Sequence, residues 1–181
     1  MKLVLLDRDG VLNEDRADYV KNPGELVVIA GAGEAIAHLN NAGIRVAVVS
    51  NQSAVGRGII AREMLERINA RLISELAASG GRIDLFLVCT DAPGQPSERR
   101  KPAPGMLREA LTHFRTPADE AVMIGDQLSD LRAARAAGVG RILVRTGKGV
   151  QTQALGLPAD ILPVSVYDSL MAAAISLVPN S

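Results

Sequence analysis

Short apolar runs alternate with longer amphipathic stretches along this chain of 181 residues. Five of the runs are rich in Val, Ile and Leu and are four to six residues long, as expected for parallel strands that are buried on both faces of a sheet. These predicted strands span residues 2–6, 44–49, 84–88, 121–124 and 141–145.

Between these runs, Ala and Leu recur at helical spacing. The predicted helices span residues 34–41, 62–78, 104–114 and 128–137, with a last one at 167–177. Gly43, Gly80 and Gly138 follow three of them, where glycine commonly ends a helix. Regular alternation of strand and helix predicts an α/β fold: a doubly wound, Rossmann-like parallel sheet of about five strands with helices on both faces.

Two stretches interrupt this alternation. Residues 13–31 begin polar and become apolar, which is typical of a flap or an extra hairpin over one edge of the sheet. Residues 90–104 are rich in proline and charge, which predicts a surface loop. Neither is large enough to form a separate cap domain, so we expect residues 1–181 to form a single domain.

Composition narrows the possible partners. The chain is 48% hydrophobic and 22% charged, enough for a compact domain without disulfides, and its only cysteine is Cys89. The apolar run before Asp7 is too short for a signal peptide or membrane span, so we expect a cytoplasmic protein. Lys plus Arg equals Asp plus Glu, 20 each, and aromatic residues are few. Partners such as nucleic acid or a membrane are therefore not expected, and we predict a monomer that binds a small molecule.

Polar residues follow four of the predicted strands. Asp7 and Asp9 follow the first, the segment 50–53 (Ser-Asn-Gln-Ser) the second, Lys101 lies beyond the third, and Asp126 follows the fourth. Each alone could be an ordinary turn, helix cap or surface charge. Together they are expected to meet at the carboxyl edge of the sheet, where ligands bind in this architecture.

This combination suits phosphoryl transfer. Asp7, Asp9 and Asp126 offer the carboxylate oxygens that Mg²⁺ prefers, and one carboxylate could attack phosphorus while Ser50 and Lys101 hold the phosphate oxygens. The remaining aspartate would act as general acid and then base. That role requires a protonated carboxyl group, so we expect its pKa to be raised by its neighbours.

Four segments resemble the motifs of haloacid dehalogenase-type phosphatases: residues 6–13, 50–53, 100–102 and 125–130, within a match over about 3–149. The resemblance implies Asp7 as nucleophile and Asp9 as general acid/base. It also implies Mg²⁺ bound by Asp7, Asp126 and the backbone carbonyl of Asp9. Ser50 and Lys101 would stabilise the phosphoryl group, and Asp130 would orient its neighbours.

More narrowly, residues 51–58, 100–106 and 144–149 resemble the subgroup that removes the 7-phosphate of D-glycero-D-manno-heptose 1,7-bisphosphate. This implies a role in making the heptose precursor of lipopolysaccharide core or of a surface-layer glycan. Arg57, Arg99, Arg100 and Lys101 form a basic group that suits a second phosphate, or that could simply solvate a loop. The predicted substrate contacts are Asp15, Asp18, Tyr19, Asn51, Gln52, Ser53, Arg57, Arg100 and Gln127.

The chain departs from that subgroup at two places. Many relatives carry a zinc site in the loop before Arg100, but here only Cys89 stands in a matching position, so no structural zinc is expected. The loop would then be held by its prolines and ion pairs. Gln127 follows Asp126 and cannot supply the positive charge that a lysine would.

Two alternatives stay open. One is a histidinol-phosphate phosphatase, which shares ancestry with the subgroup, although an ammonium-bearing substrate would favour acids over arginines. The other is a non-enzymatic phospho-receiver domain, which takes phosphate on an aspartate after the third strand. Asp91 is the candidate there, but Asp7 at the end of the first strand fits the nucleophile of an enzyme better.

Overall fold

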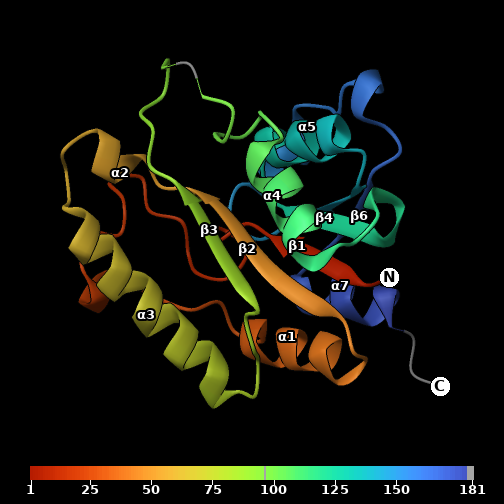
Figure 1. The fold of residues 1–181 in the computed structure, drawn as a ribbon, viewed down its shortest axis with the longest axis horizontal. Helices are drawn as coiled ribbons and strands as arrows, with labels where there is room; N and C mark the ends of the chain where they lie inside the picture. The colour runs from red at the N-terminus through yellow and green to blue at the C-terminus, as the bar shows by residue number, and fades with distance from the viewer. Residues whose placement is uncertain (96, 179–181) are drawn as a thin grey trace.

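Six parallel strands form the central sheet of the computed structural model, which describes residues 1–95 and 97–178 (Figure 1). The strands are β1 (Leu3–Leu6), β2 (Arg45–Asn51), β3 (Leu85–Cys89), β4 (Ala121–Gly125), β5 (Gly140–Val144) and β6 (Ser165–Tyr167), in the order β3-β2-β1-β4-β5-β6. The predicted doubly wound parallel sheet is confirmed. It has six strands where about five were expected, because the short edge strand β6 follows the last predicted one.

Helices cover both faces of the sheet (Figure 1). On one face lie α1 (Ala32–Asn41), α3 (Arg62–Ala78) and α7 (Leu170–Leu177), and on the other α4 (Gly105–Phe114) and α5 (Leu128–Ala137). The period of two in a strand explains this division, since Val4 and Leu6 pack under the first group whereas Leu3 and Leu5 pack under the second. Two short helices, α2 (Ser53–Gly56) and α6 (Gly149–Ala154), complete the order, with 3-10 turns at Pro23–Glu25, Ala118–Glu120 and Ala159–Ile161.

The strand order creates a crevice beside β1. The chain passes from β1 to β2 on one side, and after β3 it crosses to β4 on the other side of β1. The loops that follow β1 and β4 therefore leave the sheet in opposite directions, and the gap between them is the usual ligand position in doubly wound sheets.

Part of residues 13–31 forms a short antiparallel pairing, in line with the hairpin alternative. The backbone N–H of Glu14 donates to Val27 O at 2.8 Å, and that of Ile29 donates to Leu12 O at 2.9 Å. Asn13 bridges Val28 between them. This pairing anchors the segment 15–20 as a loop just after β1.

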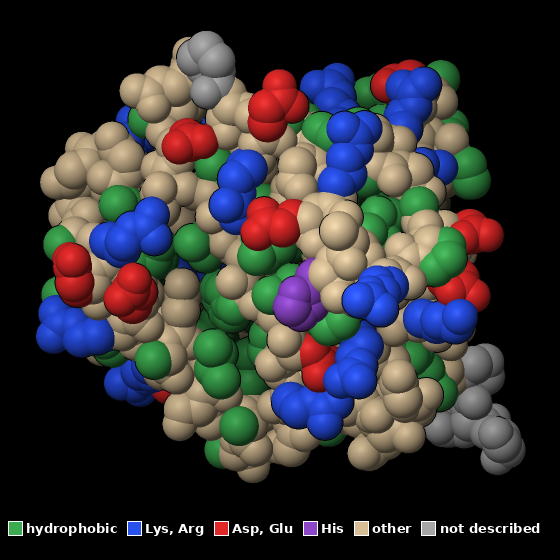
Figure 2. All heavy atoms as spheres, in the orientation of Figure 1, with side chains coloured by type: hydrophobic (Ala, Val, Ile, Leu, Met, Phe, Trp, Pro, Cys, Tyr) green, Lys and Arg blue, Asp and Glu red, His purple; other side chains and the backbone are tan. Residues whose placement is uncertain are grey.

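Charged side chains of both signs are spread over the face shown in Figure 2, with hydrophobic side chains in a hollow over β3. Leu85, Phe86 and Val88 of this edge strand are only partly buried. Among the described residues, no helix combines the length and apolar character needed to span a membrane.

Candidate active site

A cavity of about 430 Å³ opens at the carboxyl ends of the central strands. Its walls come from the segments at the ends of β1, β2, β3, β4 and β5, as expected from the strand order. The lining includes ten residues that were predicted from the sequence: Asp7, Asp9, Asp15, Tyr19, Asn51, Gln52, Ser53, Arg100, Lys101 and Gln127.

Four predicted residues are outside that lining set. Ser50 and Asp126 are buried directly behind the wall, where the side chain of Gln52 donates to Ser50 Oγ at 2.8 Å. Asp18 and Arg57 are exposed, and Asp18 is paired with Lys21. The structure thus gathers the predicted catalytic group but leaves these last two predicted substrate contacts away from the cavity.

Three carboxylates form a compact group that fits a divalent cation. Oxygen atoms of Asp7, Asp126 and Asp130 all lie within 4.8 Å of one another, and Asp126 Oδ1 is buried without a hydrogen-bond partner. Burial raises the pKa of Asp7 to about 7 and that of Asp126 to about 8, and neighbouring carboxylates add to both shifts. A bound Mg²⁺ would relieve this repulsion and satisfy the orphaned oxygen.

Lys101 lies at the centre of this acidic group. Its Nζ is 2.9 Å from Asp7 Oδ1 and 2.7 Å from Asp130 Oδ1, and its side chain is 1% exposed. Burial alone would lower the pKa of Lys101, but the two carboxylates outweigh it and raise the pKa. The side chain of Asn51 forms two hydrogen bonds with the backbone of Lys101: it donates to the carbonyl at 2.9 Å and accepts from the N–H at 3.0 Å. The position of Lys101 is therefore fixed both at its backbone and at its ammonium group.

The carboxylate of Asp130 contacts two neighbouring residues. Its Oδ1 faces Lys101, while its Oδ2 accepts the N–H of Gln127 at 3.0 Å in the capping box of α5. Gly125 makes this approach possible, since a Cβ there would overlap the Asp130 carboxylate. This engagement suits the predicted orienting role.

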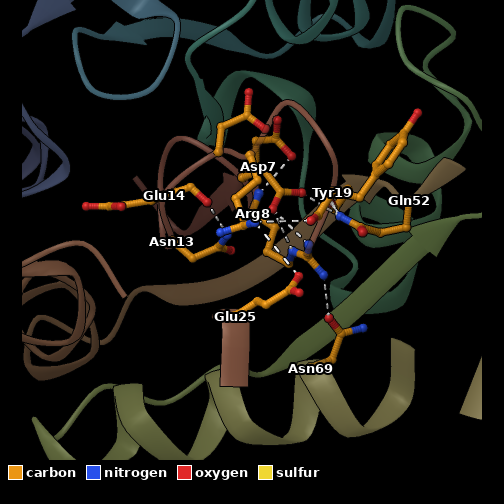
Figure 3. Close-up of polar contacts among 12 residues, drawn as sticks. Asp7, Arg8, Asn13, Glu14, Tyr19, Glu25, Gln52 and Asn69 are labelled. Atoms are coloured by element: carbon orange, nitrogen blue, oxygen red, sulfur yellow. Dashed lines mark hydrogen bonds and ion pairs between the residues drawn. The ribbon is translucent and has the colours of Figure 1, made fainter. Parts of the chain in front are cut away.

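The prediction that neighbouring groups raise the pKa of Asp9 is wrong. Burial raises it, but the Arg8 guanidinium and hydrogen bonds from Arg8, Asn13 and Gln52 outweigh burial and hold the pKa of Asp9 below its usual value. Arg8 Nη2 donates to Asp9 Oδ1 at 2.8 Å, and Gln52 Nε2 donates to Asp9 Oδ2 at 2.7 Å. Figure 3 shows the side chain of Arg8 reaching away from Asp7 toward Asn69 of α3, to which it donates at 3.0 Å.

Two glycines let the backbone close around Asp126. A Cβ on Gly10 or Gly147 would overlap Asp126 Oδ2, the oxygen that accepts the N–H of Lys148 at 2.8 Å. Thr146 Oγ1 also donates to Gly10 O at 2.6 Å, which ties the loop after β5 to the loop after β1. The position of the Asp126 carboxylate therefore depends on close backbone packing.

We expect Gly10→Ala to impair both folding and activity. Gly10 has a φ of +83° and no room for a side chain, whereas Gly31 has a φ of +82° and open space around it. Strain alone would cost about 1 kcal/mol in each variant. In urea unfolding, the loss of unfolding free energy should be larger for Gly10→Ala than for Gly31→Ala by about 2 kcal/mol, and only Gly10→Ala should disturb the function of the cavity. Equal losses would contradict this role of Gly10.

Several cavity residues were missed from the sequence, and Lys148 matters most. Lys148 Nζ is 2.7 Å from Asp15 Oδ2 across the cavity, and the Lys148 side chain remains half-exposed. The hydrogen bond to Asp15 raises the pKa of Lys148. Arg8 also lines the cavity. The segment containing Lys148 was part of the family resemblance, so its charge could have been noted, whereas nothing in the local sequence marks Arg8 as buried.

Comparison with known proteins agrees with this geometry. A family model described as HAD-hydrolase-like matches residues 98–173. Two curated relatives, from Pseudomonas putida and Pseudomonas aeruginosa, are 41% and 42% identical over 98% and 97% of this chain, and over 100% and 97% of their own lengths. Both are named D-glycero-beta-D-manno-heptose-1,7-bisphosphate 7-phosphatase.

Solved structures give the same result. The D,D-heptose 1,7-bisphosphate phosphatase of Bordetella bronchiseptica, crystallised with magnesium and phosphate, superimposes with a TM-score of 0.93 at 37% identity over the full length of both chains. The Burkholderia thailandensis enzyme gives 0.75 at 36% identity, over 99% of this chain and 100% of its own.

Fold and site thus define a phosphoric monoester hydrolase of the haloacid dehalogenase type. Because identity above 40% extends over nearly the whole chain, the protein belongs to the heptose 1,7-bisphosphate 7-phosphatase family.

Proposed function

We propose that this phosphatase removes the 7-phosphate of D-glycero-β-D-manno-heptose 1,7-bisphosphate in a magnesium-dependent reaction, through a phosphate ester on Asp7. The observation that carries the proposal is the full-length similarity to relatives of that name, combined with a cavity lined by Asp7, Lys101 and additional cations. A cytoplasmic enzyme of heptose biosynthesis, serving a lipopolysaccharide core or surface-layer glycan, follows from the same similarity. One domain comprising residues 1–181 is also part of this proposal.

Asp7 is the nucleophile in this account. Its carboxylate lines the cavity at the end of β1, and Lys101 holds Oδ1 in place. The other oxygen attacks phosphorus in line with the leaving O7 of the sugar, so an O–P bond forms at Asp7 as the P–O7 bond breaks. Mg²⁺ held by Asp7, Asp126 and the backbone carbonyl of Asp9 would neutralise phosphate charge, so that a carboxylate can approach.

Asp9 acts as the general acid and then as the general base. It protonates O7 as the sugar leaves, then removes a proton from the water that attacks the phosphate ester, releasing inorganic phosphate and free Asp7. Arg8 keeps Asp9 ionised before substrate arrives. A phosphate dianion placed beside Asp9 raises its pKa, so the required proton is taken up together with substrate. Ser50 and Lys101 stabilise the charge on the transferring phosphoryl group.

The remaining cavity wall recognises the sugar and its second phosphate. Asp15, Tyr19, Gln52, Ser53 and Gln127 offer hydrogen-bonding groups, Asn51 acts through Lys101, and Arg100 supplies a forked cation. Asp18 and Arg57 stay predicted contacts. Lys148 adds a partly exposed cation where Gln127 supplies none, and we include it in the substrate site.

We expect Lys148→Gln to weaken substrate binding selectively. Losing one partly exposed cation from a phosphate contact should raise KM for the bisphosphate about 10-fold and leave kcat within about twofold. Lys21→Gln is the matched control, because Lys21 is also paired with an aspartate but lies outside the cavity lining. Initial rates over a range of substrate concentrations separate the two constants. An unchanged KM would remove Lys148 from the site.

Initial rates of phosphate release decide between candidate substrates. Both anomers of the heptose bisphosphate and histidinol phosphate are compared in the presence of Mg²⁺. The proposal predicts a preference of at least about 100-fold in kcat/KM for the β-anomer over histidinol phosphate, since each charge contact is worth roughly tenfold or more. Turnover of histidinol phosphate alone would assign the enzyme to that substrate instead.

A further inference from the structure

The loop between β3 and α4 carries two cavity cations, Arg100 and Lys101, beyond the carboxyl end of β3 (Figure 1). Its described residues form no helix or strand, so other contacts must fix the position of Arg100. The proline at position 96, one of those expected to hold the loop, lies outside the described residues.

Asp91 connects the two sides of this loop. Its Oδ2 accepts hydrogen bonds from Ser97 Oγ at 2.5 Å and from the buried Cys89 Sγ, at the end of β3, at 3.2 Å. These bonds lower the pKa of Asp91. The carboxylate thus joins Cys89, at the end of β3, to Ser97, which is eight positions further along the chain.

Ser97 passes this constraint on to Arg100. A hydroxyl has one proton and two lone pairs, so donation to Asp91 turns the lone pairs toward other donors. Ser97 Oγ accepts the backbone N–H of Arg100 at 3.0 Å and that of Arg99 at 3.3 Å. The guanidinium is held from the other side, where Arg100 Nη1 donates to the carbonyl of Asp91 at 2.9 Å. Both ends of Arg100 therefore depend on the same two residues.

Lys101 is held independently. Its backbone is gripped by Asn51, and its head group lies between Asp7 and Asp130. Neither Asp91 nor Ser97 belongs to the residues that line the cavity. Breaking the hydrogen bond between Asp91 and Ser97 should therefore displace Arg100. Lys101, which lies next to Asp7, should stay in place.

We propose that Asp91 and Ser97 are positioning residues for substrate recognition: together they form a metal-free clamp that presents the guanidinium of Arg100 to the phosphate that is not cleaved. This role rests on the proposed function, because it assumes a bisphosphate substrate. It also assigns Asp91 a use unrelated to accepting phosphate.

Steady-state kinetics test the clamp through two substrates. Ser97→Ala and Asp91→Asn should raise KM for the heptose bisphosphate about 10-fold with kcat within about twofold, while kcat/KM for p-nitrophenyl phosphate, which has no second phosphate, should hardly change. Ser97→Thr retains the hydroxyl and should restore a KM near that of the wild type. Glu98→Gln, an exposed neighbour in the same loop, is the control. Equal losses with both substrates, or an unchanged KM, would overturn the clamp.

Amide hydrogen exchange tests the same clamp without any substrate. In Ser97→Ala the amides of Arg99 and Arg100 should exchange at least about 10-fold faster, whereas the amide of Lys101, bonded to Asn51, should keep its protection. Unchanged exchange at Arg100 would contradict the proposal even if the true substrate were another phosphate ester. Absence of bisphosphate turnover by the wild type, with the exchange result as expected, would count against the proposed substrate and leave the clamp intact.

Discussion

Asp7→Asn should lower magnesium-dependent phosphate release at least about 1,000-fold, because the amide cannot form the phosphate ester of the proposed mechanism. The effect on folding should be opposite in direction. At pH 8 the ionised Asp7 carboxylate is buried among other acids and its pKa is raised to about 7, so the neutral amide removes an unfavourable charge. Without Mg²⁺, the variant should therefore unfold at an equal or higher urea concentration than the wild type.

Asp119→Asn is the matched control for this substitution. Asp119 is exposed in the 3-10 turn before β4, so its amide variant should retain both activity and stability. Near-normal activity of Asp7→Asn would disprove the assignment of the nucleophile. Loss of activity together with unfolding would disprove the account of the acidic group, since that account predicts a folded and inactive protein.

Without Mg²⁺, the protein should lose stability as pH rises from about 5 to above 8. Asp7 and Asp126 have folded-state pKa values raised to about 7 and about 8, from a usual value of 3.8. In this window the folded state therefore binds more protons than the unfolded state, and the free energy of unfolding decreases with pH. One pKa unit corresponds to about 1.4 kcal/mol, so the loss should be on the order of a few kcal/mol.

Mg²⁺ should reverse this loss, most strongly at high pH. The cation binds ionised carboxylates and must displace their protons at low pH, so its stabilisation should be larger at pH 8 than at pH 6. Urea unfolding with and without Mg²⁺ across this range provides the measurement. Asp126→Asn should flatten both dependences, since it removes one of the two titrating groups and one proposed metal ligand. A larger effect of Mg²⁺ at pH 6 than at pH 8 would contradict the arrangement.

The fold was predictable because its strands are continuous apolar runs and its helices have clear ends. Helices α3 and α5 coincide with the predicted ranges 62–78 and 128–137, and Gly138 ends α5 with a φ of +77°. Strand β6 was missed because Ser165–Tyr167 is three residues long and none of them is fully buried. Such a strand has too few positions to show a periodic pattern.

The site was predictable in its position and less so in its electrostatics. Asp7 and Asp126 lie close together because they follow the ends of the neighbouring parallel strands β1 and β4, and this does not depend on the conformation of the loops. The pKa of Asp9 depends on Arg8, whose guanidinium is oriented by Asn69, 61 positions away in α3. Local sequence does not reveal such a partner, and no role was predicted for Arg8. Lys148 enters the site for a similar reason, because the packing of Gly10 against Gly147 brings its loop to the cavity.

Phosphorus NMR of the reaction shows directly whether this protein cleaves the 7-phosphate of the heptose bisphosphate catalytically. With Mg²⁺ and the β-anomer in at least 100-fold molar excess over enzyme, the account predicts that the signal of the 7-phosphate is replaced by inorganic phosphate over many turnovers. The signal of the 1-phosphate should remain. Cleavage at position 1, or release of a single phosphate equivalent per protein, would contradict it.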